Sequence, residues 1–147
     1  MQWIVKTFEE LTTTELYAVL RLRSEVFVVE QECAYPDLDN SDQKALHLMG
    51  YDAEQELVAY TRLFGPGIKY DQASIGRVVT SKKARGTGAG RALMEKSIAT
   101  VEARFGKGAI KIGAQQYLQK FYTSLGFVQS SEMYLEDKIP HIEMIRN

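Results

Sequence analysis

Apolar and polar residues follow two different periodicities in the first third of the chain. Met1 to Phe8 shows the mixed alternation of a β-strand. A helical spacing begins near Thr14, where Thr13 or Thr14 itself is the expected cap, and its apolar face comprises Leu16, Val19, Leu20 and Phe27. We expect two successive helices in this region. The run Val26 to Val29 is apolar throughout, so the pattern does not define where the helical region ends.

The middle of the chain has the pattern of an antiparallel meander. Cys33 to Gln43 is rich in Asp, Asn and Ser, which favours a loop. Three strand-like runs follow, Leu46 to Tyr51, Glu56 to Phe64 and Ala73 to Thr80, and short turns separate them. Such short connections are typical of strands that pair with their neighbours in sequence.

Helix and strand patterns then alternate to the end of the chain. An amphipathic helix ends at Gly106, a strand covers about Ala109 to Ala114, and a second helical spacing covers Tyr117 to Leu125. Two further strands are expected around a turn at Asp137-Lys138, over Phe127 to Leu135 and Ile139 to Ile145. The predicted order, β α α β β β α β α β β, indicates an α/β (α+β) fold with a mixed, mostly antiparallel sheet.

Composition narrows the class of protein. The 147 residues, 45% of them hydrophobic, suit one domain that spans 1–147. The apolar runs are too short to cross a bilayer and the start lacks a signal pattern, so we expect a cytoplasmic protein. Cys33 is the only cysteine, which excludes an intrachain disulfide and a multi-cysteine zinc site. A net charge of -1 argues against binding to nucleic acid or to an anionic membrane.

Charge is nevertheless unevenly distributed. Glu30 to Asp42 holds five acidic residues, and Lys82 to Lys96 is mainly basic. The acidic stretch is expected either to be a solvated loop or to border a site that attracts a cationic amine. Its carboxylates at Asp37, Asp39 and Asp42 lack the glycine and the final glutamate of a calcium loop, so we expect no metal.

A glycine-rich loop is the strongest local signal. A strand ends near Thr80, and Ser81 to Gly88 leads into a helix, an arrangement in which free backbone N–H groups bind an anion. Gly90-Arg91-Ala92 replaces the Gly-Lys-Ser/Thr of a nucleotide P-loop, and the glycine spacing differs from that of a dinucleotide site. From these residues alone, a nucleotide-binding loop and a glycine-softened basic turn both remain open.

Two motifs resemble those of the GNAT acetyltransferase superfamily. Arg85, Gly88 and Gly90 match its pyrophosphate signature, Arg/Gln-x-x-Gly-x-Gly/Ala, and Lys120 to Phe127 resembles its Phe-Tyr and Leu-Gly-Phe segment. The similarity to the ElaA-like branch is closer and extends over nearly the whole chain, through Leu22 to Gln31, Tyr35 to Asp39 and Glu136 to Ile142.

The resemblance implies a fold, a co-substrate and a reaction. The fold would be a sheet of about seven strands flanked by about four helices. The reaction would be transfer of an acetyl group from acetyl-CoA to a small-molecule or peptidic primary amine, by direct attack in a ternary complex. The expected CoA-binding residues are Val78, Val79, Thr80, Arg85, Gly86, Thr87, Gly88, Ala89, Gly90, Arg91, Gln115 and Tyr122.

Catalytic roles follow from the same resemblance and from the chemistry of the side chains. Tyr122 corresponds to the family's general acid, which protonates the departing thiolate. The candidates for the general base are Glu30, His47 and His141, with His141 preferred. An acetyl-Cys33 intermediate is disfavoured because nearby acids should raise the thiol pKa.

Two further possibilities remain at this point. The chain could be a non-catalytic module that binds or senses acyl-CoA, since no base is obvious. The last two expected strands could also pair between copies to form a homodimer.

Overall fold

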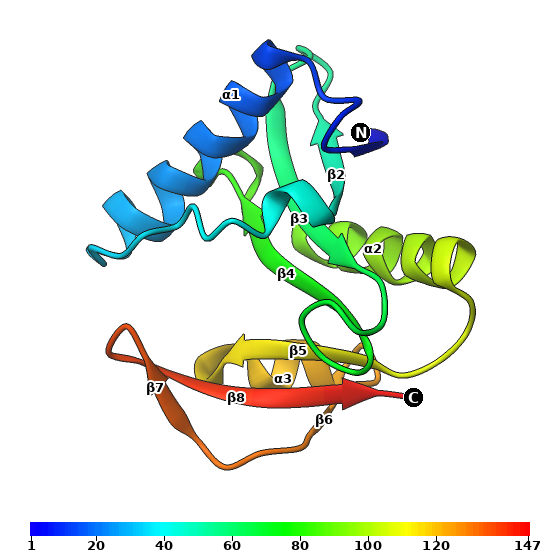
Figure 1. Cartoon of the computed structure of the whole chain (residues 1–147). Coiled ribbons are helices and arrows are strands. Elements are labelled where there is room, and N and C mark those ends of the chain that lie inside the picture. Colours follow the sequence, from blue (N-terminus) through cyan, green and yellow to red (C-terminus); the bar gives the residue numbers. More distant parts are fainter.

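The computed structural model describes every residue from Met1 to Asn147, and its centre is one mixed β-sheet (Figure 1). Only the β4–β5 pair is parallel. The strands run in the order β1-β2-β3-β4-β5-β8-β6, and β7 also pairs with β8. They are β1 (Gln2–Thr7), β2 (Leu46–Tyr51), β3 (Leu57–Phe64), β4 (Ala73–Thr80), β5 (Ile110–Gln115), β6 (Val128–Gln129), β7 (Tyr134–Glu136) and β8 (Ile139–Arg146). The expected α+β class is confirmed.

Three α-helices pack on this sheet, where about four were expected. They are α1 (Thr13–Arg23), α2 (Ala89–Phe105) and α3 (Gln119–Thr123). The expected second helix is a wider, π-helical continuation of α1 over Ser24–Glu30, because the backbone passes from one to the other without leaving the helical region. No helix combines the length and the apolar character needed to cross a membrane.

Helix α1 begins one residue earlier than expected. Its cap is Thr12, and neither Thr13 nor Thr14 takes that role. The Thr12 hydroxyl accepts a hydrogen bond from Glu15 N–H at 3.1 Å, and the Glu15 carboxylate accepts one from Thr12 N–H at 2.8 Å. This reciprocal capping box satisfies two donors at once, which a cap at Thr13 or Thr14 would not do because no acid follows either at three residues.

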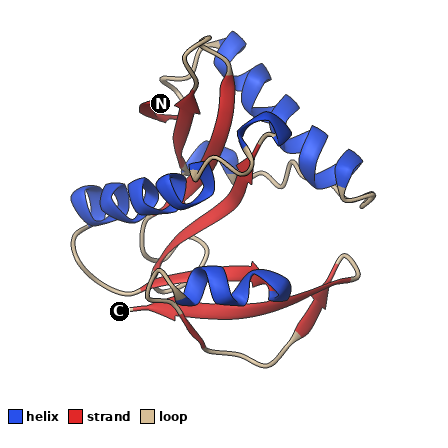
Figure 2. Cartoon of the chain, turned by 180° about the vertical axis from the view of Figure 1, so that it is seen from behind, coloured by secondary structure: helices blue, strands red, loops and turns tan.

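Each face of the sheet carries a core of its own. On one face Val19 and Leu22 of α1 pack against alternate strand residues, Met49, Tyr60 and Val79. On the other face Leu93 and Met94 of α2 meet the residues that point the opposite way, which include Leu48, Ala59 and Ile75. Figure 2 shows α2 and α3 on the same side of the sheet. Both faces of the central strands are therefore buried, as the alternation of side chains along β-strands requires.

Strands β4 and β5 separate almost as soon as they meet. They pair only through Ala73 with Ile110 and Ser74 with Lys111, after which β5 continues beside β8 alone. Figure 1 shows the two strands diverging toward their C-terminal ends. A bulge on β4 opposite Thr61 places Arg77 at φ 51° and increases the local bend of this strand.

The C-terminal region differs from the expected pattern in two places. The helix expected from Tyr117 to Leu125 is a 3₁₀ turn, Gln116–Leu118, followed by the short α3. The strand expected over Phe127 to Leu135 is interrupted between β6 and β7, where Ser131 bonds to the backbone of Glu143. The turn at Asp137-Lys138 is confirmed, with φ values of 49° and 67°. The final strand β8 has partners on both edges, so it offers no free edge to another copy.

The acidic loop is held to the sheet by three arginines. Asp37 and Asp42 are largely buried, so the expectation of a solvated loop is wrong for these two residues. The ion pairs are Arg23–Asp42 at 2.7 Å, Arg23–Asp37 at 2.9 Å, Arg77–Asp37 at 2.7 Å, Arg62–Asp39 at 2.7 Å and Arg62–Asp42 at 3.0 Å. Arginines from α1, β3 and β4 thus anchor one loop, and their ion pairs neutralise most of the loop's charge.

His47 belongs to this same network. Its Nε2–H donates to the Asp42 carbonyl at 2.9 Å, because a carbonyl can only accept, and its Nδ1 then accepts from the Tyr60 hydroxyl at 2.6 Å. The side chain is fully buried, and burial lowers the pKa of His47. Both ring nitrogens are occupied, so His47 has a structural role and is withdrawn as a general-base candidate.

We expect Asp42→Ala to destabilise the protein by about 3 kcal/mol, because it leaves two buried arginines short of a counter-ion. The matched control is Glu25→Ala, which removes the exposed pair with Arg21 and should cost less than about 0.5 kcal/mol. Urea unfolding at neutral pH measures both. Pairing with Arg23 lowers the pKa of Asp42 in the folded state, so this stabilisation should disappear as the pH falls below about 4. Equal costs for the two variants would contradict the assigned role.

Candidate functional site

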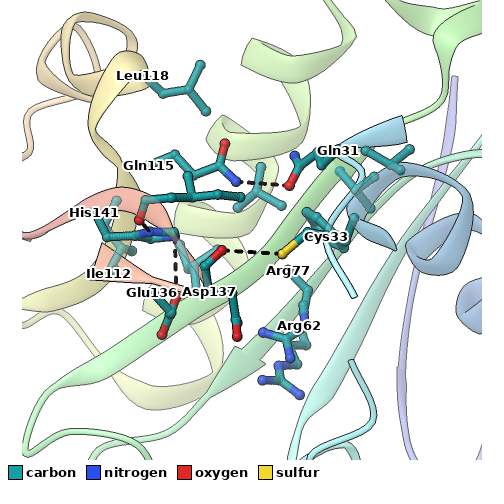
Figure 3. Close-up of a pocket in the computed structure, with 18 of the residues that line it drawn as sticks. Gln31, Cys33, Arg62, Arg77, Ile112, Gln115, Leu118, Glu136, Asp137 and His141 are labelled. Carbon is teal, nitrogen blue, oxygen red and sulfur yellow. Dashed lines mark hydrogen bonds and ion pairs between the residues drawn. The ribbon is translucent and has the colours of Figure 1, made fainter. Parts of the chain in front are cut away.

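A cavity of about 850 Å³ occupies the space between the diverging strands. Its walls come from β4, β5, the π-helical segment with the loop that follows it, and the β7–β8 hairpin. Two contacts cross it: Gln115 Nε2 donates to Gln31 Oε1 at 3.2 Å, and Cys33 Sγ donates to the Asp137 carbonyl at 3.5 Å (Figure 3). The cavity is therefore bounded by segments that are distant in sequence.

Most of the residues expected to form a site meet around this cavity. Those that line it are Glu30, Val78, Val79, Thr80, Arg85, Gly90, Gln115, Tyr122 and His141. The other expected residues lie beside it, on the glycine loop and the start of α2, and they are Gly86, Thr87, Gly88, Ala89 and Arg91. Sequence reasoning thus identified one contiguous region.

The edge of β4 that faces the cavity has no strand partner beyond Ser74. Ser81 N–H donates to Val58 on the β3 side at 2.8 Å. Because successive N–H groups of a strand point to opposite edges, the N–H of Thr80 points toward the open edge. This part of β4 can bind an extended ligand as an additional strand would be bound.

The glycine loop leads directly into α2. Gly86 and Gly88 have φ values of 77° and 83°, which favour glycine. The Thr87 hydroxyl donates to the Ala84 carbonyl and steadies the turn. Helix α2 begins at Ala89 without a side-chain cap, so the N–H groups of its first turn are available to an anion.

Gly90 has no structural reason to be glycine. It lies in the first turn of α2, its φ is ordinary, and a Cβ built there would meet no atom of the chain within 4 Å. Glycine in a helix costs up to about 1 kcal/mol relative to alanine. A small residue with open space around it leaves room for a ligand to approach the backbone of this turn.

Arg85 and Glu30 form an ion pair at the mouth of the cavity. The guanidinium lies 2.7 Å from the carboxylate, and Lys82 is 3.8 Å away. The hydrogen bond from Arg85 lowers the pKa of the Glu30 carboxyl. Nearby, Arg91 donates to the Ser124 hydroxyl at 2.7 Å, which places a second cation beside the loop.

Tyr122 is one of the residues that line the cavity. The side chain is only 5% exposed, and its ring packs edge-on against Phe121 and Phe127. No group of the chain hydrogen-bonds the hydroxyl, although aromatic packing holds the ring in place. Burial raises the pKa of Tyr122, so the phenol keeps its proton at neutral pH. A protonated, unpartnered phenol in a cavity is suited to donate a proton to a ligand.

His141 occupies the opposite wall, on β8. Its Nδ1–H donates to the Ile139 carbonyl at 2.8 Å, and its ring stacks on Tyr134. The remaining nitrogen, Nε2, lies 3.3 Å from the Glu136 carboxylate (Figure 3). Because the backbone carbonyl fixes the proton on Nδ1, Nε2 is the atom that can accept or release a proton.

Several cavity residues were not identified from the sequence. They are Tyr35, Arg62, Phe64, Lys69, Tyr70, Arg77, Gly113, Tyr134 and Glu136. A charged residue at position 62, inside a largely apolar run, is the one local signal that could have drawn attention to this wall. Arg77 and Gly113 lie within β4 and β5, and the others come from loops and strand ends, where the sequence carries no periodic pattern.

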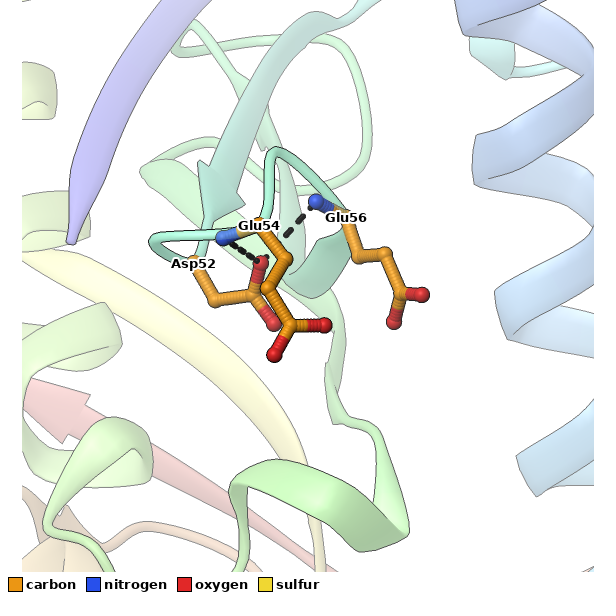
Figure 4. A group of neighbouring side chains, drawn as sticks. All are labelled: Asp52, Glu54 and Glu56. Carbon is orange, nitrogen blue, oxygen red and sulfur yellow. Dashed lines mark hydrogen bonds between the residues drawn. The ribbon is translucent and has the colours of Figure 1, made fainter.

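Lys83 lies away from the cavity, among three carboxylates of the β2–β3 turn. Asp52, Glu54 and Glu56 gather there, and Asp52 accepts backbone hydrogen bonds from the other two (Figure 4). The Lys83 Nζ is 3.0 to 3.5 Å from all three carboxylates and serves as their cation. This cluster is an ion-paired turn on the surface.

Comparison with known proteins places this geometry in a family. The model of the acetyltransferase (GNAT) domain matches residues 10–147. The protein ElaA of Escherichia coli is 40% identical over 99% of this chain and 96% of its own, and its crystal structure superposes with a TM-score of 0.91. An acyl-CoA N-acyltransferase from Pseudomonas aeruginosa is 44% identical over the whole of both chains, with a TM-score of 0.93. An aminoglycoside 6'-N-acetyltransferase complexed with coenzyme A shares the fold, with a TM-score of 0.69 at 16% identity over 97% of this chain and 96% of its own.

The absence of a partner for Tyr122 predicts how the protein tolerates its loss. Tyr122→Phe should change the free energy of unfolding by less than about 0.5 kcal/mol, because no internal hydrogen bond is broken. Tyr60→Phe is the matched comparison: it leaves buried His47 without its donor and should cost about 1 to 3 kcal/mol. Chemical denaturation measures both, and a large loss for Tyr122→Phe would show that its hydroxyl is structural.

Proposed function

This chain belongs to the GNAT acetyltransferase family, in its ElaA-like branch, and we propose that it transfers the acetyl group of acetyl-CoA to a primary amine by direct attack in a ternary complex. The observation that carries the proposal is the open edge of β4 next to a glycine loop in which Gly90 has no internal reason to be glycine. An extended arm that ends in a diphosphate fits these two features together.

The donor would lie along β4 with its diphosphate at the start of α2. The amide groups of the pantetheine arm pair with the backbone of Val78 to Thr80, as a further strand would. The Gln115 side chain lines the same cavity, where its amide donates to Gln31 and could bind the pantetheine arm. The N–H groups of the loop from Arg85 to Gly90 bind the diphosphate, and Arg91 adds a positive charge.

The reaction then needs one bond formed and one broken at the acetyl carbon. The neutral amine attacks the thioester carbonyl, and a backbone N–H near Val79, for which that of Thr80 has the right direction, stabilises the oxyanion. When the tetrahedral intermediate collapses, the C–S bond breaks and the Tyr122 hydroxyl gives its proton to the CoA thiolate. The nitrogen loses its extra proton to a base, and the products are an N-acetyl amide and free CoA.

His141 suits the role of base better than Glu30. Its Nε2 faces the cavity, and Glu136 stabilises the imidazolium that forms when the nitrogen accepts a proton. The Arg85 ion pair stabilises Glu30 as a carboxylate with a lowered pKa, which weakens it as a proton acceptor. Glu30 is then a positioning residue that orients Arg85 at the mouth of the cavity.

Direct transfer is favoured over an acetyl-cysteine intermediate. Cys33 lies in the cavity wall, but its thiol donates to the Asp137 carbonyl. A nucleophilic thiolate needs a cation or a helix N-terminus beside it, and the one hydrogen bond of Cys33 Sγ goes to a neutral carbonyl instead.

A module that binds acyl-CoA without transferring it is the alternative. A free-thiol assay of CoA release, with acetyl-CoA and a panel of amines, separates the two. Amine-dependent thiol release supports the enzyme. Tight CoA binding in calorimetry, without release by any amine, would support the module. Calorimetric binding of ATP in preference to CoA would reject both.

Tyr122→Phe tests the proposed chemistry directly. We expect turnover to fall about 100-fold while the affinity for CoA stays within about twofold, because only the proton donor is lost. Tyr17→Phe is the control, since Tyr17 is an exposed tyrosine of α1 that does not line the cavity. Unchanged turnover in Tyr122→Phe would remove this residue from the mechanism.

Gly90→Leu should have opposite effects on binding and on stability. The family signature admits alanine at this position, but the larger leucine side chain would project into the space where the diphosphate would lie, so CoA affinity should fall about tenfold or more. The free energy of unfolding should rise by about 0.5 kcal/mol, because leucine favours the helix more than glycine does. Gly108→Leu, also in open space, should leave CoA affinity unchanged. Undiminished affinity in Gly90→Leu would place the donor elsewhere.

A further inference from the structure

Arg62 of β3 lines the cavity, and one of its hydrogen-bond donors has no partner in the chain. The residue is 3% exposed, and its two terminal nitrogens bind Asp39 and Asp42. Its Nε–H is buried and has no partner. Leaving a buried donor of a charged group unsatisfied is costly, and native proteins rarely do so without a reason. A ligand acceptor atom in the adjacent cavity would supply the missing partner.

Two tyrosine hydroxyls converge at Gly113 of β5, which also lines the cavity, and Tyr134 stacks on His141. A Cβ placed on Gly113 would lie 3.2 Å from the Tyr134 oxygen and 3.5 Å from the Tyr70 oxygen. Neither hydroxyl bonds to another group of the chain. Burial raises the pKa of Tyr134 to about 12 and raises that of Tyr70 as well, so both remain donors at neutral pH. Gly113 keeps open the space that these two donors face.

The charge of this region is positive, although the loop above it is acidic. Four cations meet three carboxylates: Arg23, Arg62, Lys69 and Arg77 against Asp37, Asp39 and Asp42. The carboxylates are all engaged by arginines. Lys69, which is 34% exposed, contacts Asp39 at only 3.5 Å and stays available to a ligand. The expectation that this loop attracts a cationic amine therefore loses its basis.

A negative group lies on the other wall. Glu136 is 62% exposed and stands beside His141 Nε2. Figure 3 shows Arg62 and Arg77 on one wall of the cavity, and Glu136 and His141 on another. The cavity thus offers a cationic, donor-rich pole and an anionic pole that holds the proposed base.

We infer that the acceptor is a small primary amine that carries a carboxylate, a compound of the amino-acid class. This inference rests on the proposed acetyl transfer. The carboxylate accepts hydrogen bonds from Arg62 Nε, the two tyrosine hydroxyls and Lys69, while the amino group lies near Glu136 and His141. A polyamine or a lysine side chain has no anionic group to place against the cationic pole, so it is the poorer acceptor.

Matched acceptors test the inference. Amino acids, the corresponding amino acid amides and spermidine are compared for CoA release. Amino acids should show a kcat/KM at least tenfold above that of their amides, mainly through a lower KM, because only the carboxylate differs. Equal values for each pair, or a preference for spermidine, would overturn the inference while confirming acetyl transfer.

Variants of the cationic pole assign the preference to this wall. Lys69→Met and Tyr70→Phe should each lower the ratio of kcat/KM for amino acids to kcat/KM for their amides about tenfold, mainly through the KM for amino acids. Lys107→Met, on an exposed turn away from the cavity, is the matched control. If amino acids keep their advantage in both variants, the carboxylate does not bind at this pole and the inference fails.

A binding measurement keeps the test independent of turnover. Calorimetry with CoA present compares an N-acetyl amino acid with its N-acetyl amide, and the acid should bind at least tenfold more tightly to the wild type. If no amine releases CoA, the proposed transfer fails. Tighter binding of the acid would then still support the carboxylate site, and equal or absent binding of the two compounds would overturn it.

Discussion

The separation of β4 from β5 after two paired residues is the constraint on which the molecule depends. If the strands stayed together, the backbone of β4 beyond Ser74 would be bonded to β5, and no cavity would exist. The bulge at Arg77 bends β4 away, and the ion pair between Arg77 and Asp37 holds that residue in its left-handed conformation. Each unpaired group on the open edge is available to a ligand, which is why this bent strand is the proposed binding surface.

The arginine–aspartate network turns an acidic loop into a wall of the cavity. Charges taken from water need partners, and here each aspartate is shared among arginines from α1, β3 and β4. The loop is thereby attached to three elements at once, and ion pairs with these arginines neutralise most of its negative charge. Arg62, Lys69 and Arg77 line the cavity beside Asp39, so the cations outnumber the carboxylates of the loop there, opposite to what the loop's composition suggested.

The two ends of the cavity are built by different means. The proposed donor end consists mainly of backbone, in the edge of β4 and the glycine loop, because N–H groups recognise amides and phosphates without the help of particular side chains. The proposed acceptor end consists of side chains contributed by strands and turns, which can be varied without disturbing the sheet. Tyr122 and His141 face the space between them, where an acetyl group would pass from one ligand to the other.

Local signals in the sequence determined the order of the elements, the glycine loop and the family, because strand and helix periodicity and glycine spacing are properties of neighbouring residues. Periodicity could not place the end of α1, where the helix widens, or show that β6 and β7 are separate, since both depend on packing against other segments. The side chains of the proposed acceptor site were brought together by tertiary structure alone. Asp37, Asp39 and Asp42 read as a solvated or amine-attracting loop because their partners, Arg23, Arg62 and Arg77, are 14 to 40 residues away, and only folding brings such distant charges within 3 Å.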